Sequence, residues 1–255
     1  ILTTQDYKMI VISPAKRLSN KACNIILNAT TPIFKKEANL LAAELAKLNA
    51  SDIRSLMGVS ESIAEINVER FKSWDNSTTE EKRAIFQFEG DVFKHLDAKN
   101  LDDKDIKYMN KKLRILSGIY GVLRPSDEMN PYRLEMGTQY SVGNKKNLYE
   151  FWGDKIANHL KTETKGNILF NLASEEYYSS IKKHTGTMKV INFKFLSISN
   201  NKERVVGVIA KRARGEMARF LIKNRLEDTK GIENFSSMGF KFKEFENNTF
   251  TFVVS

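Results

Sequence analysis

Short apolar runs typical of β-strands alternate along this chain with segments of helical periodicity, and this alternation excludes most fold classes. The first run, residues 9–13, is expected to form a buried strand that ends at Ser13-Pro14. Further strands are expected at 113–122, 167–172, 188–198, 203–210 and 249–254. Intermixed strands and helices favour an α/β or mixed α+β class, with a mixed sheet surrounded by helices.

Turn residues rather than linkers separate the helical segments. Helices are expected to begin near Pro32 and to cover 51–57, 60–74, 79–88, 91–96, 102–112, 147–160 and 212–226. The chain has no internal repeat and no low-complexity tract, so we expect a single domain over 9–255. Because Met9 opens the first strand, residues 1–8 are expected to be an upstream extension or an artificial remnant.

The charge balance of the chain indicates what kind of partner it binds. Its 255 residues contain 41 Lys and Arg against 31 Asp and Glu, a net charge of +10. Polyanions are the obvious partners, and the alternative is that lysine only serves solubility. No run approaches the roughly 18–20 apolar residues of a membrane span, and the start does not resemble a signal peptide. We therefore expect a soluble cytoplasmic protein with no membrane contact and no obligate protein partner.

Metal and redox chemistry are not expected from the thiol and imidazole groups. The single cysteine, Cys23, excludes a disulfide framework and a multi-thiolate metal site. The histidines, His95, His159 and His184, are scattered without ligand spacing. We therefore expect no bound metal, no cofactor and an inert Cys23 thiol.

Segment 202–225 carries most of the excess positive charge. Its eight basic residues stand against Glu203 and Glu216 and give +6 of the chain's +10: Lys202, Arg204, Lys211, Arg212, Arg214, Arg219, Lys223 and Arg225. One helix face is expected to hold Arg212, Arg219 and Lys223. The inward face is expected to hold Ala213, Met217, Phe220 and Leu221. Guanidinium groups bind phosphate with a planar fork of donors, so this segment predicts polyanion binding, whereas an ordinary solvated face mixes both signs.

A second phosphate-binding candidate is the turn around Gly58. Two short helices joined by Leu56-Met57-Gly58-Val59 fit a helix-hairpin-helix, with Ser60 opening the second helix. In that motif, backbone N–H groups of the turn and of the following helix N-terminus face a phosphate, so binding does not depend on base sequence. The alternative is a purely structural helical corner, since helices often end in glycine.

Polar residues that could support acid–base chemistry recur elsewhere. Lys16 follows the first strand, where ligands bind in open α/β sheets and where its ammonium could hold a phosphate. The pair Glu150 and Asp154 lies at i, i+4 of a predicted helix, where carboxylates act as acid and base or only face solvent. Further candidates are Arg133, Glu135, Asn171 and Glu176. Ser174, beside them, is explained as a helix N-cap.

Seven segments together resemble the bacterial YaaA peroxide-stress family. They are residues 12–16, 88–92, 116–125, 132–138, 147–154, 171–177 and 211–219. The match follows the chain in order from about Met9 to its C-terminus, so it is specific. Two departures are mild: Glu89 replaces a lysine and Glu216 an apolar residue. Glu89 weakens the expectation of a DNA contact at its turn.

The resemblance implies a cytosolic protein of the hydrogen peroxide response, associated with limiting free intracellular iron. It also implies DNA binding, duplex or structured, and an unusual mixed fold with a positively charged cleft and a helix-hairpin-helix-like element. Our first hypothesis is accordingly a non-catalytic DNA-binding protein. Its expected phosphate contacts are Lys16, Gly58, Ser60, Lys211, Arg212, Arg214, Arg219 and Lys223.

The alternative hypothesis is an enzyme that acts on a nucleotide or a nucleic acid. Its candidate catalytic residues are Lys16, Arg133, Glu135, Glu150, Asp154 and Glu176. Convergence of these side chains in one pocket would favour the enzyme, whereas dispersed side chains only cap helices and bridge elements.

Overall fold

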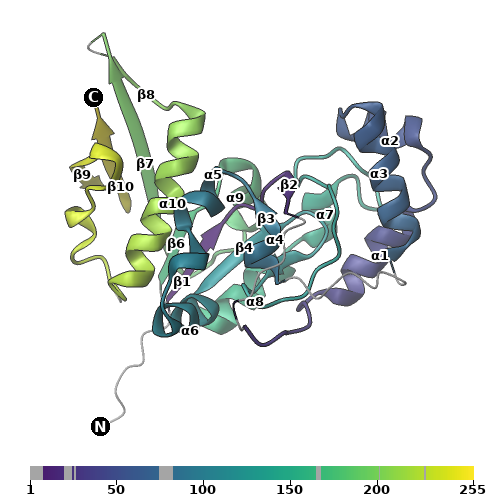
Figure 1. Cartoon of the computed structure of the whole chain (residues 1–255), viewed down its shortest axis with the longest axis horizontal. Helices are drawn as coiled ribbons and strands as arrows, with labels where there is room; N and C mark the ends of the chain where they lie inside the picture. The colour runs from purple at the N-terminus through teal and green to yellow at the C-terminus, as the bar shows by residue number, and fades with distance from the viewer. Residues whose placement is uncertain are drawn as a thin grey trace.

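A mixed eight-stranded sheet forms the centre of the molecule in the computed structural model (Figure 1), which describes residues 8–19, 25, 27–74, 83–164, 168–200, 202–226 and 228–255. The strand order is β5-β4-β1-β6-β7-β10-β9, and β8 pairs with β7. Their bounds are β1 Lys8–Ile12, β4 Leu113–Ser117, β5 Gly121–Leu123, β6 Ile168–Leu172, β7 Lys189–Ser199, β8 Lys202–Arg204, β9 Lys241–Glu246 and β10 Thr249–Val254. Two further strands, β2 (Arg17–Leu18) and β3 (Phe88–Glu89), pair with each other. The expected fold class is confirmed.

The strand β1 lies in the middle of a parallel core formed by β4, β1, β6, β7 and β10. Its residues Ile10, Val11 and Ile12 are fully buried, which fits a parallel strand covered on both faces. The chain continues from β1 to β4 on one side of β1 and then crosses to β6 on the other. The strand order therefore reverses at β1, and ligands of open α/β sheets bind at the carboxyl end of such a position.

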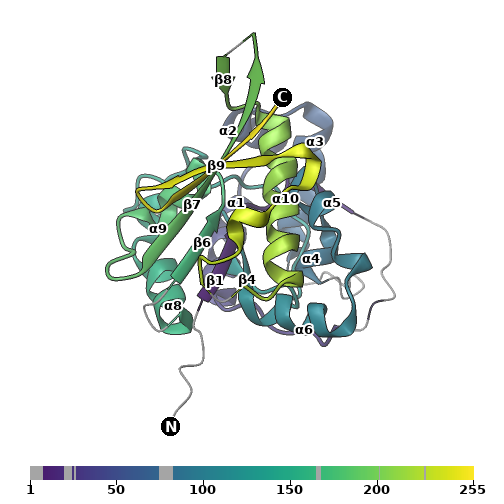
Figure 2. The same ribbon diagram turned by 90° about the vertical axis from the view of Figure 1, so that its left-hand side faces the viewer.

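Helices cover both faces of the sheet (Figure 2). One face carries α5 (Asp91–Leu96), α6 (Asp103–Lys112) and α10 (Gly207–Lys223), and the other carries α8 (Lys155–Thr164) and α9 (Glu175–Lys182). The helix α10 crosses α5 at Gly215, where a Cβ atom would lie 2.3 Å from the carbonyl oxygen of Val92. Only glycine permits this approach, which fixes the position of the basic residues before it.

A helical unit lies toward the opposite end of the long axis from α10 and the C-terminal strands (Figure 1). It contains α1 (Lys35–Leu45), α2 (Ala50–Met57) and α3 (Glu61–Lys72). The side chains of Asn49 and Asp52 form a capping box at the start of α2, and the helix ends at Gly58 with φ 58°. Shorter elements complete the fold: α4 Ala84–Gln87, α7 Leu148–Trp152, η2 Ala98–Asn100, η3 Ile232–Asn234 and η4 Ser237–Gly239.

Three predicted elements differ from the structure. The strand expected at 113–122 is two antiparallel strands, β4 and β5, joined by a turn at 118–120. The first part of the helix expected at 79–88 lies outside the described residues, and its second part contains α4.

The strand expected at 203–210 ends at Arg204, and the helix α10 begins at Gly207. Burial there follows a helical spacing, since Val208 is exposed while Ala210 and Ala213 are buried. The helix expected at 147–160 is two helices, α7 and α8, because Gly153 has φ 50° and interrupts the helical backbone. In the described part of the chain, no helix is long and apolar enough to cross a membrane.

Candidate functional site

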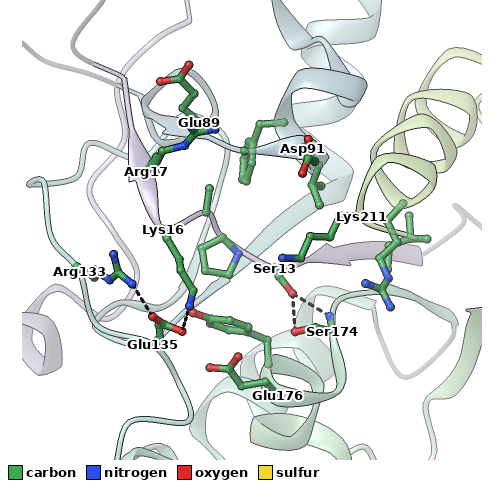
Figure 3. Close-up of a pocket in the computed structure, with 18 of the residues that line it drawn as sticks. Ser13, Lys16, Arg17, Glu89, Asp91, Arg133, Glu135, Ser174, Glu176 and Lys211 are labelled. Carbon is green, nitrogen blue, oxygen red and sulfur yellow. Dashed lines mark hydrogen bonds and ion pairs between the residues drawn. The ribbon is translucent and has the colours of Figure 1, made fainter. Parts of the chain in front are cut away.

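A cavity of about 270 Å³ opens at the carboxyl ends of β1 and β6, where the strand order reverses. We call it the β1–β6 cavity (Figure 3). Its walls come from the segment after β1, the turn between β3 and α5, the loop 132–135, the junction of β6 with α9, and α10. The sheet topology thus brings together residues that are far apart in the sequence.

Two serine hydroxyls tie the ends of β1 and β6 together at the floor of this cavity. The Ser13 hydroxyl donates a hydrogen bond to Ser174 Oγ at 3.2 Å and accepts one from the Ser174 N–H at 2.8 Å. Ser174 does occupy the N-cap position of α9, but its side chain bonds to no helix amide. The predicted capping role of Ser174 is therefore confirmed in position and wrong in its hydrogen bond, because the hydroxyl is bonded to Ser13 instead.

The α10 side of the cavity carries two cations, Lys211 and Arg214, one helical turn apart. Lys211 is exposed and Arg214 is half-buried. Within the described residues, neither side chain has an acidic partner or a hydrogen-bond acceptor. Burial lowers the pKa of the Arg214 guanidinium, which nevertheless stays charged at any physiological pH. A partly desolvated cation without a partner is costly, so this side of the cavity fits an anion.

The other side of the cavity holds four of the predicted candidates. The Lys16 ammonium lies 2.7 Å from Glu135 Oε2, and Arg133 Nη2 lies 3.3 Å from Glu135 Oε1. The Arg133 Nε–H is buried and has no hydrogen-bond partner in the described part of the chain. Glu176 Oε1 accepts a hydrogen bond from the Gly137 N–H at 3.0 Å and so holds the loop that carries Arg133 and Glu135. These four side chains therefore converge.

The remaining catalytic candidates lie elsewhere and stabilise local structure. Glu150 Oε2 accepts a hydrogen bond from the Lys146 N–H at 3.0 Å, and Asp154 Oδ2 accepts one from Asn158 at 2.8 Å. Both acids line a second cavity of about 580 Å³, beside α7. The Asn171 amide donates to Asn192 Oδ1 at 2.9 Å and bridges β6 to β7. The geometry does not place these three residues in the β1–β6 cavity.

The basic face predicted on α10 is divided among several roles. Arg219 donates hydrogen bonds to the carbonyl oxygens of Leu96, Asp97 and Asn100 at 2.9, 2.7 and 3.2 Å. Its guanidinium thus caps the end of α5, where helix carbonyls need partners. Arg212 Nε lies 3.6 Å from Asp91 Oδ1, and Lys223 is exposed outside the cavity. The inward face is as expected, with these residues buried or half-buried: Ala213, Met217, Phe220 and Leu221.

The hairpin between α2 and α3 presents an uncapped helix start. The Ser60 hydroxyl contacts Ser62 Oγ at 3.2 Å and makes no capping hydrogen bond to α3. The N-terminal amides of α3 therefore have no side-chain cap among the described residues. A phosphate site at a helix start requires such uncapped N–H groups. The hairpin and α10 lie toward opposite ends of the molecule (Figure 1). Its helix-hairpin-helix role stays a prediction, and only an extended ligand spans both regions.

Sequence reasoning did not single out several residues that line the cavity. Arg17 follows Lys16, Tyr177 follows Glu176, and Asp91 lies at the turn that was identified through Glu89. The sequence signal that could have identified them is that each lies within two positions of a residue already singled out in the sequence. Burial raises the pKa of the Tyr177 phenol well above its ordinary value, so this hydroxyl stays protonated. Since the lining contains acids as well as bases, the positively charged cleft stays a prediction.

No group of three or more His, Cys, Asp or Glu side chains that could hold a metal occurs among the residues described by the structure. Two histidines instead contact acidic side chains: His95 Nδ1 lies 2.8 Å from Glu216 Oε1, and His159 Nε2 lies 3.2 Å from Glu163 Oε2. Cys23 lies outside the described residues, so the expectation about its thiol stays a prediction.

The fold and the cavity define an α/β protein with a polar cavity at the carboxyl ends of its parallel strands. A family model described as peroxide stress protein YaaA matches residues 9–246, and the chain belongs to this family. A UPF0246 protein of Burkholderia lata is 38% identical over 252 residues, which cover 96% of this chain and 97% of the relative. UPF0246 proteins of Polynucleobacter necessarius and Caulobacter vibrioides are 40% and 39% identical, each over 92% of this chain and 93% of the relative. The resemblance read from the sequence is confirmed.

Proposed function

We propose that this chain is a cytoplasmic peroxide-stress protein that binds DNA through phosphate contacts, without strong sequence specificity, and helps limit oxidative damage by free iron. The observation that carries the DNA-binding proposal is the pair Lys211 and Arg214, which open onto one cavity and have no acidic partner among the described residues. Arginine and lysine donors of this kind bind phosphate oxygens. The net charge of +10 would speed the approach of any polyanion.

A second phosphate contact is proposed at the start of α3, where Ser60 makes no capping hydrogen bond and the first N–H groups of the helix have no side-chain cap. The Gly58 N–H itself donates to the Arg54 carbonyl oxygen, so Gly58 would contribute the turn that brings this helix start to the surface. Contacts of this type are made to the sugar–phosphate backbone and carry no base sequence directly. With α10 and the hairpin toward opposite ends of the molecule, a DNA duplex is long enough to reach both.

Fluorescence anisotropy of a labelled duplex at constant ionic strength tests the DNA-binding proposal. Lys211→Ala and Arg214→Ala should each weaken binding about tenfold, equally for unrelated sequences, because each removes a charge-assisted contact. Lys223→Ala is the matched control: the sequence pattern predicts a phosphate contact at Lys223, whereas its exposed position outside the cavity predicts none. Equal losses in all three variants would show that only overall charge matters and would contradict the proposed site.

The part of the proposal that concerns free iron is supported by membership of the peroxide-stress family. Cells that lack the protein should contain more chelatable iron after a peroxide pulse, measured by electron paramagnetic resonance of the chelated iron. They should also accumulate more DNA strand breaks. Unchanged iron and unchanged breaks would contradict this part and would leave the DNA-binding assay unaffected.

A second candidate function is an enzyme that acts on a nucleotide or nucleic acid. The observation that favours it is the convergence of Lys16, Arg133, Glu135 and Glu176 in the β1–β6 cavity. Mass spectrometry of nucleotides and oligonucleotides after incubation with the protein tests it. Turnover that is lost in Glu135→Gln would establish an enzyme, and an absence of any product with all substrates would leave DNA binding as the function.

A further inference from the structure

The β1–β6 cavity has two chemically different sides connected by an apolar wall. Lys211 reaches toward Ser13 on one side, while Lys16, Glu135 and Glu176 lie on the other (Figure 3). The wall between them includes Pro14, Ala15, Val92, Phe93, Leu172 and Tyr177. A ligand that fills the cavity therefore needs an anionic part, a flat or apolar middle and a polar edge.

The acidic side offers one hydrogen-bond acceptor that the protein does not use. Glu176 Oε1 is bonded to the Gly137 N–H, but Glu176 Oε2 has no partner among the described residues. Glu176 is half-buried, and carboxylate oxygens accept hydrogen bonds from N–H groups. The polar edge of the ligand should therefore carry a donor, as the exocyclic amino groups of adenine, cytosine and guanine do.

The size of the cavity limits the ligand further. Pockets that take whole small molecules measure roughly 300–1,000 Å³. At about 270 Å³, the β1–β6 cavity lies just below this range and matches one small ligand rather than a base pair or a duplex.

We propose that the β1–β6 cavity binds a single nucleotide, with its phosphate on Lys211 and Arg214, its base along the apolar wall and a base amino group on Glu176 Oε2. This inference rests on the proposed function, because it gives Lys211 and Arg214 the same phosphate-binding role. The nucleotide comes from one of two sources that share this chemistry, a free mononucleotide or the terminal nucleotide of a DNA strand.

Isothermal titration calorimetry with small ligands tests the proposal. We expect dAMP to bind about tenfold more tightly than 2-deoxyribose 5-phosphate, because base–aromatic contacts are worth about that factor. Lys211→Ala should weaken both ligands by the same factor. Equal affinities for dAMP and the sugar phosphate would overturn the proposal, and so would dAMP binding that is unchanged in Lys211→Ala.

The conservative variant Glu176→Gln tests the base contact without disturbing the loop. Glutamine retains an acceptor for the Gly137 N–H and replaces the second oxygen by an amide donor. The preference for dAMP over dTMP should therefore fall about tenfold, while the affinity for 2-deoxyribose 5-phosphate stays unchanged. Glu175→Gln is the matched control, since Glu175 is exposed and pairs with Lys182 outside the cavity. A preference that is the same in both variants would overturn the assignment of Glu176.

Two further DNA ligands separate the possible sources and the two proposals. If a 5′-phosphorylated oligonucleotide displaces bound dAMP, strand ends are the source of the nucleotide. If the oligonucleotide does not displace dAMP, the free mononucleotide is the source. Closed circular DNA has no ends. If Lys211→Ala weakens its binding while dAMP does not bind at all, the nucleotide inference fails and DNA binding stands. If dAMP binds and circular DNA does not, the proposed DNA-binding function fails instead.

Discussion

At the scale of single residues, the Arg114 side chain is only 5% exposed, and the Glu163 carboxylate is the counter-charge that stabilises its guanidinium. Its Nε donates to Glu163 Oε2 at 2.7 Å. Burial raises the pKa of Glu163, but hydrogen bonds and charge from His159 and Arg114 lower it more, to about 2 against an ordinary 4.5. The carboxylate therefore stabilises the fold above pH 4.5, and this contribution is lost as the pH falls toward 2.

Glu163→Gln should lower the free energy of unfolding by about 3 kcal/mol at pH 7, because Arg114 then lacks its counter-charge. The difference between wild type and variant should shrink when urea unfolding is repeated at pH 3, where wild-type Glu163 has lost much of its advantage. A difference that stays constant from pH 7 to pH 3 would contradict this account of the ion pair.

Arg219 illustrates a residue whose spacing predicts DNA binding but whose contacts indicate stability. Arg219→Ala leaves the carbonyl oxygens of Leu96, Asp97 and Asn100 without its guanidinium and should cost about 2 kcal/mol in thermal or urea unfolding. Duplex affinity of the folded variant should fall less than that of Lys211→Ala. If Arg219→Ala instead leaves stability unchanged and loses duplex affinity, Arg219 binds phosphate and this account of it is wrong.

At the scale of elements, the close crossing of α10 over α5 positions the cations of the cavity. Gly215→Ala would place a methyl group 2.3 Å from the carbonyl oxygen of Val92, so the two helices must separate. We expect a loss of about 1–3 kcal/mol in unfolding free energy, together with weaker DNA binding, since Arg214 moves with the helix.

A second glycine of α10 provides the control for this prediction. A Cβ atom at Gly207 meets nothing within 4 Å, so Gly207→Ala should leave stability unchanged or raise it by up to about 1 kcal/mol. If both alanine variants behave alike in urea unfolding, the crossing at Gly215 does not position Arg214.

The elements also show what the sequence can and cannot predict. Buried parallel strands such as β1 were predictable, because continuous apolar runs reflect burial on both faces. The strand β9 was not, since all six of its residues are exposed and its pattern records no buried face. Glu150 and Asp154 were grouped as helix neighbours because nothing in the local pattern required Gly153 to leave the helical region.

For the site, helical spacing predicted which residues of α10 face outward but not what lies opposite them. Arg219 faces the carbonyl oxygens after α5, and Arg214 faces a cavity, although both fit the same basic pattern. The convergence of Lys16, Glu135 and Glu176 depends on the strand order, which places the end of β1 beside the end of β6. Local periodicity predicts that a segment is a strand, but it does not predict which strands are neighbours in the sheet.

At the scale of the whole molecule, the hairpin and α10 lie toward opposite ends of the long axis. Long duplexes should therefore bind more tightly than short ones that reach only one region. Ser60→Asp keeps a residue type that is favourable at the N-cap position of α3 but adds a negative charge where a phosphate would lie. It should weaken binding of long duplexes severalfold and leave short duplexes unaffected in anisotropy titrations. An equal loss for both lengths would contradict two separated contacts.

The central claim is that Lys211 and Arg214 of the β1–β6 cavity bind DNA phosphates, and the salt dependence of duplex binding tests it most directly. Each neutralised phosphate contributes about −0.9 to the slope of log affinity against log salt concentration. The Lys211→Ala/Arg214→Ala double variant should therefore have a slope about 1.8 units less steep than wild type, with Lys223→Ala unchanged. A slope that is the same in wild type and double variant would show that these cations contact no phosphate.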